Sequence, residues 1–125
     1  GYLYTRTEHE AKSIEIIEHA LRPNYINFIE STSICIAATK VGEVPKNDLA
    51  ALLKDVDIAF GSAYDFNQTN QAYREELIVS ENKRFSDEDW QKMSLDFLKN
   101  VEFYSDYGKA NFKSLVEKNL ELYAK

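Results

Sequence analysis

Two aspartates in the segment LLKDVDIAFGS, residues 52–62, are the first candidates for chemistry in this sequence. Asp55 and Asp57 stand two positions apart in a largely apolar run, where a charge is costly unless a partner compensates it. Carboxylate oxygens suit hard divalent cations such as Mg²⁺ and Mn²⁺. The pair is therefore either a solvated helix edge or the source of one cation ligand.

Helical phase separates the two aspartates. Residues two apart lie about 200° apart around an α-helix, so Asp55 and Asp57 cannot share a face. Asp57 falls one turn after Leu53 and one turn before Phe60, on the flank of an apolar stripe, and Asp55 falls farther round. We predict that Asp57 is the more inward carboxylate and that Asp55 lies on the exposed side. Taken alone, an aspartate on such a flank is more often solvated or paired with a cation than a ligand.

Three further polar residues lie near the ends of predicted helices. Thr7 and Glu10 form a capping-box pattern, which together with the helix dipole explains Glu10 without a function. His9 is expected on the surface, away from the apolar stripe of its helix. Lys40 suits a helix C-terminus, where a cation meets the negative end of the dipole, and it could equally reach a phosphate.

The elements that must position these residues are helices. Apolar residues at helical spacing predict them over residues 7–22, 24–40, 48–61 and 66–79, and again from residues 86 and 109 onward. The third helix has its apolar seam at Leu49, Leu53, Val56 and Phe60. No segment alternates with the period of two that a strand requires. The sequence predicts an all-α protein of about six helices.

Composition excludes several function classes. The chain has 125 residues, which predicts one domain, and a net charge of −6, which argues against a nucleic-acid partner. No apolar run is long enough to span a bilayer, so no membrane partner is expected and a cytoplasmic location is the default. Cys35 is the single cysteine and is expected to be a small buried hydrophobe. There is no Gly-rich phosphate loop, no Ser-His-Asp pattern and no Cys/His metal spacing.

Five motifs in order resemble a known family. They are HEAKS, IAATK, VPKNDLAALLKDVDIAFGS, SDEDW with the FL and FY pairs after it, and ANFKSLVEKNLE. Their order and spacing resemble the predicted metal-dependent phosphohydrolases of the HD superfamily. The branch in question has one helix that contains Asn-His-Glu-Glu-x-Ser and a later helix that contains Asp-Ala-Asp-Leu. Each motif is short, and their joint order across almost the whole chain carries the resemblance.

The resemblance implies an HD-like helical bundle with a divalent metal of the Mn, Mg or Fe class and a nucleotide or other phosphoester as its small phosphorylated substrate. It makes Asp57 a metal ligand, with Asp55 as the second choice. It places His9 and Glu10 as candidate catalytic residues beside the metal and phosphate cavity. Lys40 becomes a candidate contact for the substrate phosphate.

One departure from the family is large. The family takes its other ligands from an upstream His and a His-Asp dyad, and neither of the two histidines here, His9 and His19, is followed by Asp. The chain begins GYLY, as the family's sequence continues after that dyad, so we expect a C-terminal portion that lacks the first helices. The metal would then be held mostly by residues outside this chain, which pairs with a missing N-terminal segment or forms a homodimer. The alternative is a degenerate, non-catalytic HD-like module for ligand binding or oligomerisation.

Overall fold

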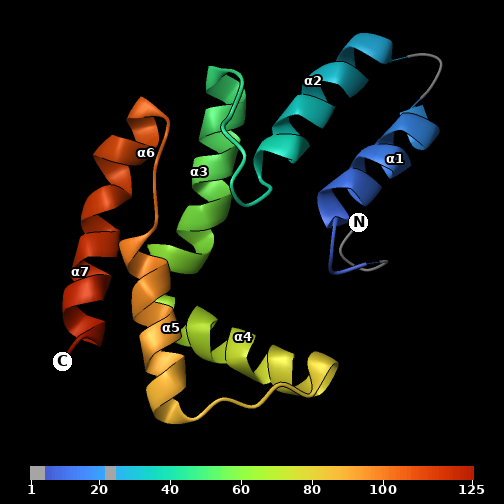
Figure 1. Ribbon diagram of the computed structural model, residues 1–125. Helices are drawn as coiled ribbons and strands as arrows, with labels where there is room; N and C mark the ends of the chain where they lie inside the picture. The colour runs from blue at the N-terminus through green and yellow to red at the C-terminus, as the bar shows by residue number, and fades with distance from the viewer. Residues whose placement is uncertain (1–4, 22–24) are drawn as a thin grey trace. The chain divides into compact units, whose positions relative to one another are not determined.

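The computed structural model describes residues 5–21 and 25–125, and within these residues it contains seven α-helices and no strand. The all-α prediction is confirmed (Figure 1). One helix more than expected arises because the chain turns at Phe112 and divides the last predicted helix in two. The helices are α1 (His9–Leu21), α2 (Ile26–Ala38), α3 (Asp48–Ser62), α4 (Phe66–Glu81), α5 (Asp87–Lys99), α6 (Asp106–Asn111) and α7 (Lys113–Tyr123).

Most helix ends fall where the sequence places them. Ser86 caps α5, since its Oγ accepts a hydrogen bond from the backbone N–H of Asp89 over 3.1 Å. At α1 the predicted capping box is wrong, because the helix begins at His9 and Glu8 takes the N-cap position with a φ of 55°. The predicted break between the first two helices, at 22–24, lies outside the described residues.

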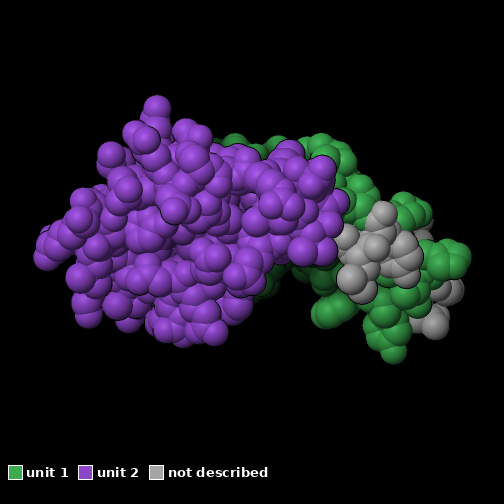
Figure 2. Space-filling view, turned by 90° about the horizontal axis from the view of Figure 1, so that it is seen from below, with its two compact units in different colours: residues 1–54 green, residues 55–125 purple. Residues whose placement is uncertain are grey.

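The chain contains two compact units, unit 1 (residues 1–54) and unit 2 (residues 55–125), which Figure 2 shows in green and purple. The boundary falls inside α3, between Lys54 and Asp55. Each unit has a hydrophobic core of its own. The expectation of a single domain from length alone stays a prediction.

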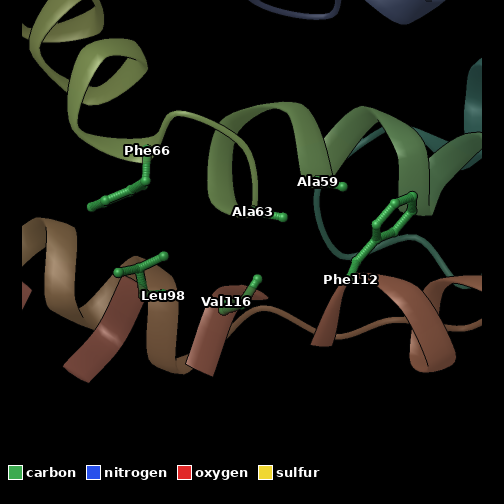
Figure 3. Close-up of a cluster of buried hydrophobic side chains, with 6 residues drawn as sticks. All are labelled: Ala59, Ala63, Phe66, Leu98, Phe112 and Val116. Atoms are coloured by element: carbon green, nitrogen blue, oxygen red, sulfur yellow. The ribbon is translucent and has the colours of Figure 1, made fainter. Parts of the chain in front are cut away.

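The larger core belongs to unit 2. It joins α3, α4, α5 and α7 through six buried side chains, which Figure 3 shows facing one another: Ala59, Ala63, Phe66, Leu98, Phe112 and Val116. Asn119 on α7 adds a polar connection, because its amide nitrogen donates to the carbonyl oxygens of Ser62 and Ala63 over 2.8 and 3.0 Å. These bonds satisfy carbonyl groups that the end of α3 leaves without a partner inside the helix.

The core of unit 1 is small. It consists of Cys35, Ala38 and Ala50, with Ile34 packed against it, and no described residue of α1 is buried. Cys35 is buried among apolar neighbours, as predicted. Little apolar area is removed from water in this unit, so packing stabilises it only weakly.

The packing of α3 differs from the prediction. The expected apolar seam is exposed, with 73% of Phe60 and 62% of Leu49 accessible to solvent and Leu53 and Val56 also exposed. The buried residues of this helix are small or polar: Ala50, Ala51, Lys54, Asp55, Ala59 and Ser62. The prediction was wrong because small side chains let neighbouring backbone approach α3 closely. The face with small and polar side chains is therefore buried, and the face with large apolar side chains is exposed.

Candidate functional site

Asp55 is fully buried, which contradicts the prediction that it lies on the exposed side of its helix. Its Oδ1 accepts the backbone N–H of Tyr104 over 2.9 Å. Its Oδ2 accepts the backbone N–H of Ser105 over 2.8 Å and the Ser105 hydroxyl over 2.6 Å. A buried carboxylate is tolerated when charge-assisted hydrogen bonds of this kind replace its water. Asp55 therefore fastens α3 to the segment that begins α6.

Gly108 makes this arrangement possible. A Cβ atom on Gly108 would collide with Oδ2 of Asp55 and would lie 2.8 Å from its Cγ. The Oγ of Ser105 also accepts the backbone N–H of Gly108 over 3.0 Å, so the same hydroxyl caps α6 and donates to Asp55. Asp55, Ser105 and Gly108 form one structural cluster, and its geometry leaves Asp55 no room for a metal ion.

Lys54 has the complementary role in unit 1. Only 8% of this residue is exposed, and its Nζ donates to the carbonyl oxygens of Ala38 and Lys40 over 2.8 Å each. These carbonyls end α2, where the helix dipole is negative and favours a cation. Two successive residues of α3 therefore stabilise helix ends of opposite polarity, a cation at the end of α2 and an anion at the start of α6.

Asp57 is exposed, so the prediction that it is the more inward aspartate is wrong. Its phase around α3 is as expected, beside the stripe that contains Leu53 and Phe60, but that stripe is itself exposed. Figure 1 shows α3 as a single helix, and within unit 2 Asp57 lies one turn before the exposed Phe60 on it. Of the two aspartates, Asp57 is the one that another molecule can reach.

Two of the predicted site residues meet in unit 1. Glu10 and Lys40 both line a cavity of about 230 Å³ between α1 and the end of α2. His9 is half-buried next to it, with Nδ1 3.2 Å from the carbonyl oxygen of Arg6 and Nε2 3.4 Å from Oε1 of Glu10.

The charges around this cavity are mixed. The Nζ of Lys40 lies 2.9 Å from a carboxylate oxygen of Glu8, and this hydrogen bond and charge raise the pKa of Lys40. The lining contains three carboxylates, of Glu8, Glu10 and Glu43, against the amines of Lys40 and Lys46. A phosphate would have to compete with Glu8 for Lys40, so the role of Lys40 as a phosphate contact stays a prediction.

The described residues do not fit a divalent metal by themselves. Among residues 5–21 and 25–125 no three His, Cys, Asp or Glu side chains come together in a group that could hold an ion. Asp55 is committed to backbone and hydroxyl donors, and Asp57 has no second acidic or histidine ligand in such a group. The described residues alone therefore do not bring three such ligands together at one place.

A second cavity lies within unit 2. It is a groove of about 470 Å³ with an apolar wall, lined at its floor by Ser94 and at its edge by Glu76. The groove is formed by the end of α3, one face of α4 and one face of α5. Its other lining residues are Gly61, Thr69, Asn70, Ala72, Tyr73, Trp90, Met93 and Phe97. The sequence predicted a helix from residue 86 onward but did not indicate this groove.

Comparison with protein-family models, with curated proteins and with solved structures finds no match to this chain. Over the part of the chain that the structure describes, no helix has both the length and the apolar character needed to cross a membrane. The resemblance to the HD superfamily therefore stays a prediction that depends on the quoted motifs.

Proposed function

We propose that this chain is the aspartate-bearing part of a metal-dependent phosphohydrolase that acts on a nucleotide or another phosphoester. Asp57 is its metal ligand, and the remaining ligands come from a segment outside this chain. The ordered motifs support the family, and one observation carries the choice of residue: Asp57 is exposed on α3, whereas Asp55 is buried and accepts hydrogen bonds from three donor groups of Tyr104 and Ser105.

The exposed face of α3 supports a covering segment. Leu49, Leu53, Val56 and Phe60 recur at spacings of four, three and four residues, which is the seam spacing of a helix that packs against another helix. Large apolar side chains that stay exposed in a row are typical of a surface that binds a partner. A helix seated there would bring its own side chains next to Asp57. The residues of this chain alone do not complete a metal site, so no catalytic step is assigned to them.

Activity of the native protein tests this proposal. Hydrolysis of a panel of nucleotides and phosphodiesters is measured with added Mn²⁺, for the wild type and for Asp57→Asn. Loss of a metal ligand should lower the rate at least about 100-fold, more than the loss of an outer-shell partner does. Asp48→Asn, an exposed aspartate in the first turn of the same helix, is the matched control and should leave the rate unchanged. An active enzyme that is insensitive to Asp57→Asn would rule out the assigned ligand.

A non-catalytic module for ligand binding is the second candidate, and the groove in unit 2 favours it. Intact mass of the native protein separates the two candidates. A mass of 14.4 kDa, equal to that of the present chain, together with no hydrolysis of any substrate would favour the binding module. A larger mass with metal-dependent hydrolysis would favour the phosphohydrolase.

A further inference from the structure

The groove in unit 2 has the size and character of a small-molecule site. Its volume of about 470 Å³ lies inside the range of roughly 300–1,000 Å³ in which proteins bind small ligands. The helices that form it, α4 and α5, belong to the same compact unit as the core in Figure 3. The groove is therefore formed by helices of one unit rather than by a loop.

The wall of the groove is aromatic and apolar. Trp90 is 5% exposed, and its ring centroid lies 6.1 Å from that of Tyr73 and 5.5 Å from that of Phe85. The Cζ of Arg74 lies 5.8 Å from the same centroid. These three neighbours hold the Trp90 ring in place. Arg74 is fixed in turn by an ion pair with Asp87 over 2.8 Å. The Trp90 ring is therefore a rigid surface for an apolar ligand.

The polar groups on the floor are occupied by one another. The side-chain nitrogen of Asn70 donates to Oγ of Ser94 over 2.9 Å and to the hydroxyl of Tyr123 over 3.1 Å. Ser94 also donates to the carbonyl oxygen of Trp90 over 2.7 Å. Asn70 and Ser94 therefore do not demand hydrogen bonds from a ligand, so the part of a ligand that lies against them can be apolar.

Charge is present only at the edge. Glu76 is exposed and is the one charged side chain among the residues that line the groove. It lies three residues after Tyr73 on α4, so the carboxylate and the aromatic ring share one helix face. A carboxylate beside an aromatic ring attracts a cation and repels an anion. The net charge of −6 acts in the same direction.

We propose that this groove binds a small amphiphile that has an apolar chain or ring and a protonated amine. The apolar body lies against Trp90, Met93 and Phe97, and the ammonium group lies at the edge beside Glu76 and Tyr73. Met93 and Phe97 are large apolar side chains that remain exposed, and such a ligand would cover them. The proposal deepens the binding-module candidate and involves neither Asp57 nor a metal.

Trp90 is the single tryptophan of the chain and reports directly on the groove. We propose to titrate the protein with n-octylamine, n-octanol and n-octanoate below their micelle concentrations at neutral pH, and to follow Trp90 fluorescence and the heat of binding. The amine should bind about fivefold more tightly than the alcohol, which corresponds to an exposed ion pair of about 1 kcal/mol. The carboxylate should bind most weakly.

Two variants make the assignment specific. Glu76→Gln should remove the preference for the amine and leave the affinity for the alcohol unchanged. Glu117→Gln, an exposed carboxylate on α7 that does not line the groove, is the matched control and should keep the preference. Phe97→Ala should lower the affinity for all three ligands severalfold. Circular dichroism checks that each variant is folded.

Equal affinities for the three ligands, or an amine preference that survives Glu76→Gln, would overturn the proposal. Binding of none of them would overturn it as well. None of these three outcomes would affect the phosphohydrolase proposal, because metal-dependent hydrolysis is measured separately and depends on Asp57.

Discussion

Replacement of Asp55 by Asn tests the most unexpected feature of the structure, the buried carboxylate that fastens α3 to the start of α6. Asn has nearly the same shape, but it has one acceptor oxygen where Asp has two. The NH₂ group of Asn would replace one of the two acceptor oxygens and would itself point a donor at the donors of Ser105 or Tyr104. Either the hydrogen bonds from Ser105 or the bond from Tyr104 must therefore be lost.

The magnitude follows from the number of bonds. A hydrogen bond to a charged group contributes about 1.5–3 kcal/mol, and a buried donor left without an acceptor costs about 1–3 kcal/mol. If the Asn oxygen keeps the Tyr104 bond, the two bonds from Ser105 to Oδ2 are lost. We expect Asp55→Asn to lower the free energy of unfolding by about 3–5 kcal/mol, a large share of the about 5–15 kcal/mol typical of a folded domain.

Urea unfolding followed by circular dichroism measures this loss. The matched control is Asp57→Asn, the same chemical change two residues later on an exposed position, which should shift stability by no more than about 1 kcal/mol, the range of an exposed ion pair. A variant of Asp55 that is unfolded without urea agrees with the prediction. A loss below about 1 kcal/mol, or equal losses for the two aspartates, would refute the role of Asp55.

Three further predictions concern single residues. Gly108→Ala should destabilise the protein by about 1–3 kcal/mol because the added Cβ meets the carboxylate of Asp55, whereas Gly61→Ala on α3 has open space around it and should stabilise the protein by up to about 1 kcal/mol. Thermal unfolding compares the two variants, and equal shifts would contradict the close approach of Gly108 to Asp55. Lys54→Met keeps the apolar stem but loses both bonds to the end of α2, so urea unfolding should show a loss of about 1–3 kcal/mol; an unchanged midpoint would refute the capping role. Burial and the carboxylate of Glu102 raise the pKa of Tyr104, so the unfolded chain loses the phenol proton at a lower pH than the folded protein does, and the free energy of unfolding falls as pH rises above 10.0. Tyr104→Phe should reduce that fall. Identical dependence of stability on pH in the variant and the wild type would contradict the raised pKa.

The helices themselves were predictable because each depends on local sequence. Periodicity located all of the helical regions, and the SDED segment placed the start of α5 at Ser86 and Asp87. The division at Phe112 was not predictable in this way. It depends on tertiary packing, since Phe112 is buried in the core of unit 2 and contacts the rings of Tyr64 and Phe103.

The candidate site could be predicted only in part, and α3 shows why. Helical phase correctly separated the two aspartates, but the assumption that the bulky face packs inward reversed their burial. Two of the donors to Asp55 are backbone N–H groups 49 and 50 residues away, which no side-chain motif reveals, and the third is the hydroxyl of the same distant Ser105. Lys54 was missed for the same reason, since its acceptors are carbonyl oxygens at the end of another helix. A run of Ala and Ser on one face of α3 was the available signal that this face packs closely.

The affinity for Mn²⁺ tests the central claim, that this chain supplies one ligand of a metal site completed from elsewhere. Titration calorimetry compares the present 125-residue chain with the native protein, each as wild type and as Asp57→Asn. We expect no tight binding by the chain alone, and tight binding by the native protein that Asp57→Asn weakens strongly. Tight binding by the 125-residue chain alone, or tight binding by the native protein that does not depend on Asp57, would contradict it.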